Sequence, residues 1–199
     1  MPFVRLIPTL SLKDGRIIKT VEFDRYRDIG DPKTMGKVFD SQDVDELIFS
    51  DITATQESRD PDWKNISRFA DQCNMPLTMG GGISSIEHIA QYLALGADKI
   101  TLNSHALTCP SFITEAASVF GSQCIVVSID CRKSRNGTYE VFGYGGSFKT
   151  GLCPTKWAAQ CVSLGAGEIL ISSIDRDGTF EGYDIGLIKK VCSSVNVPV

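Results

Sequence analysis

The chain has 199 residues, of which 42% are hydrophobic and 22% are charged, a composition that suits one globular domain with a sizeable core. The formal net charge of -4 gives no electrostatic reason to expect binding to nucleic acid or to an anionic membrane. There is no apolar run of about 18 residues and no signal-peptide pattern at the N-terminus, so we expect a cytoplasmic protein.

The seven cysteines and two histidines are scattered along the chain. No C-x-x-C pair occurs, and no spacing typical of metal ligands is present. We therefore expect reduced, mostly buried cysteines, and neither a metal nor a cofactor.

Strands are predicted to alternate with helices along the chain, and each strand is apolar throughout. This pattern is typical of parallel strands buried on both faces. The expected strands are residues 4–12, 46–52, 75–79, 98–103, 123–130 and 168–174. The expected helices are residues 32–40, 63–73, about 85–95, 110–120, 154–164 and 184–194. Residues 21–31 are polar and contain glycine, so we expect a long loop there.

A β-hairpin insertion is expected at residues 131–150, after the fifth strand. Asn136-Gly137 is a strong signal for a tight hairpin turn, and aromatic and β-branched residues flank it.

An internal repeat relates the two halves of the chain. Residues 74–77 (Asn-Met-Pro-Leu) recur as residues 196–199 (Asn-Val-Pro-Val), and residues 45–50 recur as residues 167–172 at the same offset of 122. Four strand–helix units in each half would make eight, the number that closes a (β/α)₈ TIM barrel. We therefore predict an α/β fold of this type built from two half-barrel repeats, as a single domain over residues 1–199. The count also leads us to expect that the chain stops at its seventh strand, before the barrel is complete.

Residues 80–82 form a bare glycine turn between an apolar strand and a helix whose N-cap is Ser84 or Ser85. Glycine lets backbone N–H groups approach a ligand closely, and the N-terminus of a helix favours an anion. One interpretation is a phosphate site that includes Gly81 and Gly82, and the other is a tight turn with no ligand. The sequence around the turn matches neither a dinucleotide fingerprint nor a P-loop.

The ends of the strands supply further candidates, because the active face of a (β/α)₈ barrel lies there. Asp130 ends an apolar strand, where a carboxylate is costly unless it has a function or a partner. It is a candidate catalytic residue, the alternative being a simple cap of the strand. Asn103 and Ser104 could donate hydrogen bonds to the same phosphate as the glycine turn. Lys19 could neutralise a substrate anion, although a single lysine on a loop is usually solvated.

Matching segments throughout the chain make it resemble the cyclase subunit of imidazole glycerol phosphate synthase, the HisF family. The segments are residues 7–8, 13–16, 30–32, 45–47, 51–54, 80–83, 96–99, 103–104, 121–127, 150–151, 165–170 and 175–179. The resemblance implies a (β/α)₈ barrel that receives ammonia from a glutaminase subunit (HisH-like) in a heterodimer. It also implies a phosphorylated small-molecule substrate, which yields imidazole glycerol phosphate and an aminoimidazole carboxamide ribotide. Asp177 and Gly178, in the segment 175–179, are included among the expected substrate-binding residues.

The resemblance also implies an ammonia gate, a ring of alternating charges at the N-terminal end of the barrel. The residues at the matching positions are Arg5, Glu46, Lys99 and Glu168. Without such a gate, these four charges would need to be explained as ordinary salt bridges.

The resemblance further implies a catalytic pair of carboxylates that act as general acid and base. Asp130 matches one member, but Ser11 stands where the family has the second aspartate. A serine hydroxyl cannot take up that proton at neutral pH without a base of its own.

Three functions are therefore open. We favour a paralogue that keeps the glutaminase partner and serves amidine formation in bacterial surface-polysaccharide biosynthesis. The alternatives are the cyclase subunit of histidine biosynthesis with an altered acid–base pair, and a non-catalytic barrel that scaffolds a glutaminase. An intact gate argues against the scaffold, because a scaffold needs no ammonia conduit.

Overall fold

The computed structural model describes residues 4–199, and its packing divides the chain into two compact units. One unit comprises the residues up to Lys19 together with residues 27–100, and the other comprises residues 20–26 and 101–199. The boundary near residue 100 falls within the fourth expected strand, so it does not coincide with the end of the first predicted half, which would follow the helix at residues 110–120. The prediction of a single domain stays a prediction.

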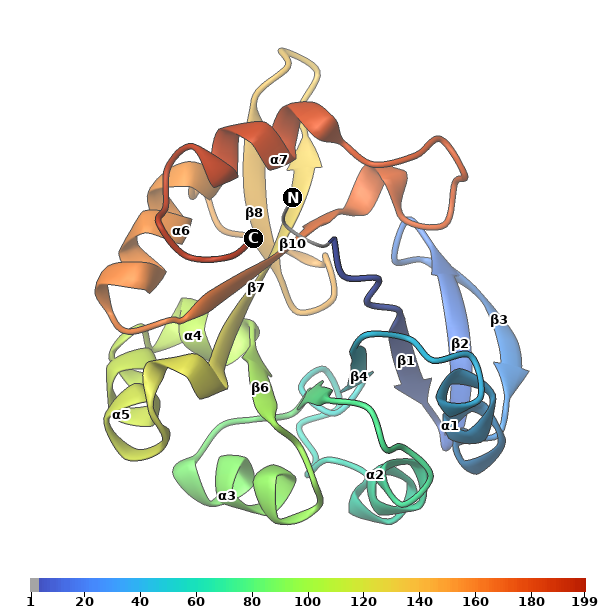
Figure 1. Cartoon of the computed structure of the whole chain (residues 1–199). Helices are drawn as coiled ribbons and strands as arrows, with labels where there is room; N and C mark the ends of the chain where they lie inside the picture. The colour runs from blue at the N-terminus through green and yellow to red at the C-terminus, as the bar shows by residue number, and fades with distance from the viewer. Residues whose placement is uncertain (1–3) are drawn as a thin grey trace. The chain divides into compact units, whose positions relative to one another are not determined.

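The strands of the first unit follow the order β3-β2-β1-β4-β5, although the end of β2 and the start of β3 fall within residues 20–26 of the second unit. β1 (Thr9–Lys13), β4 (Leu47–Asp51) and β5 (Leu77–Gly80) pair in parallel, and β2 (Arg16–Val21) pairs antiparallel with β1. β3 (Arg25–Gly30) lies at the edge of this sheet, next to β2 (Figure 1).

Three helices belong to the first unit. These are α1 (Pro32–Asp40), α2 (Trp63–Ala70) and α3 (Ile86–Ala94). Each of them has a side chain that caps the N-terminus, and for α3 this is Ser85, one of the two residues predicted there. Asp31 accepts hydrogen bonds from the first turn of α1, which has proline at its start, and Ser85 accepts one from the first turn of α3. Phe49 on β4 stacks on Phe69 of α2 with ring centroids 4.0 Å apart. Leu47 and Asp51, two positions before and after Phe49, therefore also face the helices.

The expectation of a long loop at residues 21–31 was wrong, because most of this segment is β3. A hairpin turn at Asp14-Gly15 connects β1 to β2. Asp14 and Gly15 both have positive φ, 50° and 71°, as a two-residue hairpin turn requires. The charged character of β3 suits an edge strand, where Arg16 pairs with Asp28 at 2.8 Å.

The second unit is organised around β7 (Ile125–Lys133), which pairs with two strands that follow it in the chain. β10 (Glu168–Ser173) is parallel to it, and β8 (Tyr139–Gly143) is antiparallel to its end. β9 (Phe148–Lys149) pairs with β8 and completes the hairpin, in the region where an insertion was predicted. β6 (Lys99–Leu102) spans the boundary between the units.

The helices of the second unit are α4 (Ser104–Thr108), α5 (Ser111–Phe120), α6 (Pro154–Ser163) and α7 (Ile185–Cys192). Two short 3₁₀ turns occur at Ser122–Cys124 and Ile174–Arg176. α4 was not predicted, since five residues are too few to show helical periodicity. The predicted α/β class, with strands alternating with helices and mostly parallel pairing, is confirmed.

Candidate functional site

Asp130 lies where the two pairings of β7 overlap. It is opposite Ser172 of β10 on one side and Phe142 of β8 on the other. Ile129 and Cys131, its neighbours in the strand, are fully buried on the opposite face. Asp130 itself is only 7% exposed, so its carboxylate is largely removed from water.

Asn103 holds this carboxylate. Its Nδ2 atom donates to Asp130 Oδ2 at 2.8 Å and to the carbonyl oxygen of Ser128 at 3.1 Å. Ser104 Oγ donates to Asn103 Oδ1 at 3.2 Å and accepts from the Tyr144 amide at 3.0 Å. Both hydrogens of the Asn103 amide group are therefore in use. The Asn103 side chain thus orients Asp130, and its contact with a phosphate stays a prediction.

Burial raises the pKa of Asp130 to about 6. Hydrogen bonds from Ser172 and Asn103 oppose this rise, while the negative charge of Asp177 adds to it. A carboxylate with a pKa near the working pH can both take up and release a proton, which is what a general acid–base catalyst requires. The strand-end position predicts Asp130 as a candidate, and its environment suits acid–base catalysis, but the catalytic role stays a prediction.

Ser11 and Lys19 belong to the first unit. Ser11 is half-buried in the middle of β1, opposite Ile18 and Ser50, and Lys19 is exposed on β2. No residue in the described part of the chain forms a hydrogen bond with the Ser11 hydroxyl that would deprotonate it.

The glycine turn is held in place by Tyr92 of α3. The Tyr92 hydroxyl lies 2.9 Å from the carbonyl oxygen of Gly80 and 2.8 Å from that of Gly81. Gly81 and Gly82 have φ of 97° and 66°. A Cβ on Gly81 would lie 2.0 Å from the carbonyl oxygen of Asp51, so only glycine fits there.

Asp51 next to the turn is a structural anchor. Its side chain faces the helices and is fully buried, and Arg59 donates to both of its oxygens at 2.7 and 3.0 Å. The amides of Ala54 and Asp62 also donate to it, at 3.2 and 3.0 Å. These bonds shape the loop after β4 against the glycine turn. Sequence reasoning missed Arg59 and Tyr92, because nothing in their local pattern indicates such distant acceptors.

Asp177 and Gly178 hold residues 20–23 of the second unit. The Asp177 carboxylate accepts from Thr20 Oγ1 at 2.6 Å, and its carbonyl oxygen accepts from the Glu22 amide at 2.9 Å. A Cβ on Gly178 would lie 2.1 Å from the Thr20 carbonyl oxygen. Both residues therefore have a positional role, and contact with a substrate stays a prediction.

Three of the four predicted gate residues come together in the first unit. Glu46 is 3% exposed and accepts from Arg5 at 2.8 Å, from Lys99 at 3.1 Å and from Thr78 Oγ1 at 2.7 Å. Glu46 directly precedes β4 and Lys99 begins β6, whereas Arg5 lies in the segment that leads into β1. Glu168, the fourth, begins β10 in the second unit.

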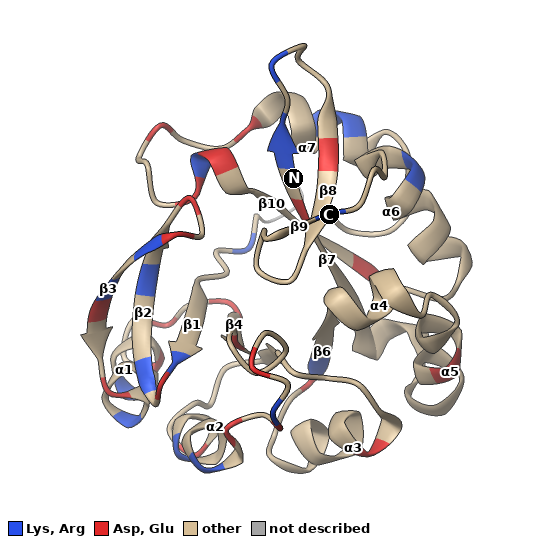
Figure 2. Ribbon diagram, turned by 180° about the vertical axis from the view of Figure 1, so that it is seen from behind, with Lys and Arg blue, Asp and Glu red and all other residues tan. Residues whose placement is uncertain are grey.

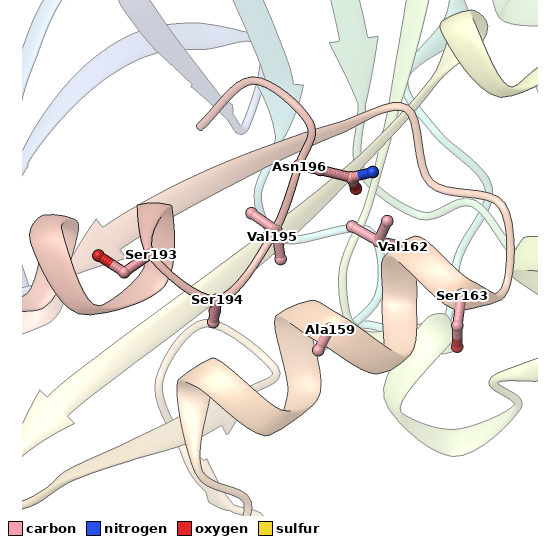
Figure 3. A pocket seen from close by; sticks show the side chains of 7 residues that line it. All are labelled: Ala159, Val162, Ser163, Ser193, Ser194, Val195 and Asn196. Carbon is pink, nitrogen blue, oxygen red and sulfur yellow. The ribbon is translucent and has the colours of Figure 1, made fainter.

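Neither of two surface hollows carries the candidate chemistry. One, of about 400 Å³, lies between α6 and the segment after α7, and Figure 3 shows its lining of alanine, valine, serine and asparagine side chains. The other, of about 370 Å³, lies beside the acidic residues at positions 40–45. In residues 4–199, no group of three or more histidine, cysteine, aspartate or glutamate side chains could hold a metal ion. No helix in that range has the length and apolar character needed to span a bilayer.

Comparison with known proteins identifies the family to which the chain belongs. Residues 5–199 match the family model described as "Histidine biosynthesis protein". The chain is 45% identical over 196 residues to "Imidazole glycerol phosphate synthase subunit HisF" of Lactococcus lactis subsp. cremoris (strain MG1363), covering 98% of this chain and 76% of the relative. It is 47% identical over 195 residues to the protein of the same name from Exiguobacterium sp. (strain AT1b), with the same coverage. The chain belongs to the HisF family of histidine biosynthesis proteins.

Proposed function

We propose that the protein is the cyclase subunit of an imidazole glycerol phosphate synthase that acts in histidine biosynthesis. The observation that carries this proposal is Asp130, a buried carboxylate with a raised pKa at a position that matches a catalytic aspartate of the family. The names of the relatives support histidine biosynthesis, and none of them refers to surface polysaccharides. We therefore place the histidine function ahead of the paralogue function that the sequence had favoured.

In this proposal Asp130 exchanges a proton with the substrate during ring closure. Asn103 orients the carboxylate, and burial keeps its pKa close to neutral. The substrate is a bisphosphorylated ribulosyl nucleotide, which fits the phosphorylated small molecule that the family resemblance implies. Gly81 and Gly82, at the N-terminus of α3, are the proposed contacts of one phosphate.

Ammonia would come from a HisH-like glutaminase subunit in a heterodimer. The support in this chain is the charged cluster of Arg5, Glu46 and Lys99 at the N-terminal ends of strands, with Glu168 as the proposed fourth member. A cluster that serves only stability would not need to match these four positions.

The test is ammonia-dependent turnover by the full-length protein and by its Asp130→Asn variant. Because asparagine cannot exchange the proton, turnover should fall on the order of 10²-fold or more. Asp71→Asn, at the exposed end of α2, is the matched control and should retain activity. Equal turnover by the wild type and the Asp130→Asn variant would remove Asp130 from the mechanism.

Ser11 supports the paralogue as a second candidate function, in which ammonia is delivered to a different acceptor. Its hydroxyl has no base bonded to it within the part of the chain that the structure describes. Under this candidate, the wild type should be a poor cyclase on the histidine-pathway nucleotide, and Ser11→Asp should raise its activity. If the wild type turns over that nucleotide as fast as the Ser11→Asp variant, the candidate loses its support.

A further inference from the structure

Arg132 has an unsatisfied hydrogen-bond donor, because its Nε atom is buried and has no hydrogen-bond partner among residues 4–199. It lies two residues after Asp130 on β7, so the two side chains leave the same face of the strand. A buried N–H without an acceptor costs free energy, and on a charged group the cost is larger.

The acidic residue opposite Arg132 is already engaged. Glu140 of β8 is its partner in the strand register, yet the Glu140 carboxylate bonds to the Gly151 amide at 2.7 Å and to Lys149 Nζ at 3.1 Å. Figure 2 shows the basic end of β7 in blue beside the single red band of β8. The Glu140 carboxylate is therefore engaged by residues on the β9 side of β8, and no ion pair joins it to Arg132 in the described part of the chain.

The Arg132 side chain is held in position by neutral groups. Its guanidinium carbon lies 5.6 Å from the centre of the Phe142 ring, and Phe142 is the residue opposite Asp130. A Cβ on Gly146 would lie 3.9 Å from Arg132 Nη2, so the turn between β8 and β9 also approaches the guanidinium. The side chain thus lies near the Asp130 end of the hairpin, and no acidic side chain among residues 4–199 pairs with it.

We propose that Arg132 binds an oxyanion, a phosphate or carboxylate group of the substrate, through its Nε–H and guanidinium edge. An anionic ligand would supply the missing acceptor and a counter-charge at once, and a guanidinium matches the geometry of such groups. The identity of this anion as part of the substrate rests on the proposed function, whereas the binding of an oxyanion does not.

The direct test is nuclear magnetic resonance of the arginine Nε–H signals during titration with inorganic phosphate. Sodium chloride at matched ionic strength is the reference. The Arg132 signal should shift to lower field as phosphate saturates, because its proton gains an acceptor. Arg135, exposed on the turn of the same hairpin, is the internal control and should move little. An Arg132 signal that does not move at high phosphate concentration overturns the proposal.

Affinity gives a second, independent readout. Arg132→Lys keeps the charge but removes the Nε–H group, and it should weaken phosphate binding about tenfold, whereas Arg135→Lys should leave it nearly unchanged. Equal affinity in the wild type and Arg132→Lys contradicts the proposal. If Arg132→Lys does not fold, the wild-type titration decides alone. A wild type without cyclase activity but with the Arg132 shift would refute the proposed function and leave this site standing.

Discussion

Asn103 Nδ2 lies 2.8 Å from Asp130 Oδ2, and the same nitrogen lies 3.1 Å from the carbonyl oxygen of Ser128. Asn103 follows β6, and Asp130 and Ser128 belong to β7. One amide group thus ties the candidate acid–base residue to the backbone of its own strand and fixes its orientation.

Asn103→Leu should raise the pKa of Asp130 further, because the hydrogen bond from Asn103 favours the charged carboxylate. If the charged form is the active one, the rise of activity with pH should move to higher pH in the variant. Carbon NMR of the Asp130 carboxyl group measures the pKa directly. Ser104→Ala is the matched control, because Ser104 bonds to Asn103 and not to Asp130. An unchanged Asp130 pKa in Asn103→Leu would show that the hydrogen bond from Asn103 does not stabilise the charged carboxylate.

Asp130 should also make stability depend on pH. Its pKa is raised from 3.8 to about 6 in the folded protein, so the folded state retains a proton that the unfolded state has lost. The free energy of unfolding should therefore fall as pH rises from about 4 through about 6, by about 3 kcal/mol from this group. Urea unfolding of wild type and Asp130→Asn across this range isolates the effect, because other groups cancel in the difference. A difference that is constant with pH would contradict the raised pKa.

Gly81→Ala should destabilise the first unit strongly. Gly81 has a φ of 97°, and a Cβ there would lie 2.0 Å from the Asp51 carbonyl oxygen. We expect a loss of about 3 kcal/mol or more in the free energy of unfolding. Gly96→Ala is the matched control, since Gly96 has a φ of 100° but nothing within 4 Å of the added atom, and should cost about 1 kcal/mol. Equal losses would show that the turn relaxes around the methyl group.

Glu46→Gln should weaken the charged cluster while keeping its shape. The neutral amide lowers the attraction for Arg5 and Lys99, and about 2 kcal/mol of stability should be lost, less than for a fully buried pair because the Arg5 side chain is 46% exposed. Asp45→Asn is the control, as the exposed Asp45 accepts from the Leu6 amide. If the cluster gates ammonia, glutamine-dependent turnover in the complex should change more than turnover with added ammonia. An equal change in both would remove the gate function.

The strand-to-helix order, two N-caps and Asp130 could be predicted because each has a local signal. Asp31 precedes a proline, Ser85 follows a glycine turn, and Asp130 ends an apolar run. β2 and β3 also had a local signal in Asp14-Gly15, but the charged residues of β3 outweighed it.

The contacts of the site could not be predicted, because they join distant parts of the chain. Asn103 reaches Asp130, Tyr92 reaches the glycine turn, and Glu140, which lies opposite Arg132, bonds to Lys149. Periodicity fixes which face a side chain leaves, whereas its partner depends on packing that a single sequence does not encode locally.

The two pairings of β7 differ in how soon each can form during folding. Phe142 follows Asp130 after one short hairpin turn, whereas Ser172 follows only after α6. Since the entropy of loop closure grows with length by about 0.6 kcal/mol for each doubling, the hairpin contact forms at lower cost. We therefore expect the β7–β8 hairpin to form first during folding and β10 to pair with β7 afterwards. Substitutions in its turn should slow refolding, whereas those in β10 should chiefly speed unfolding.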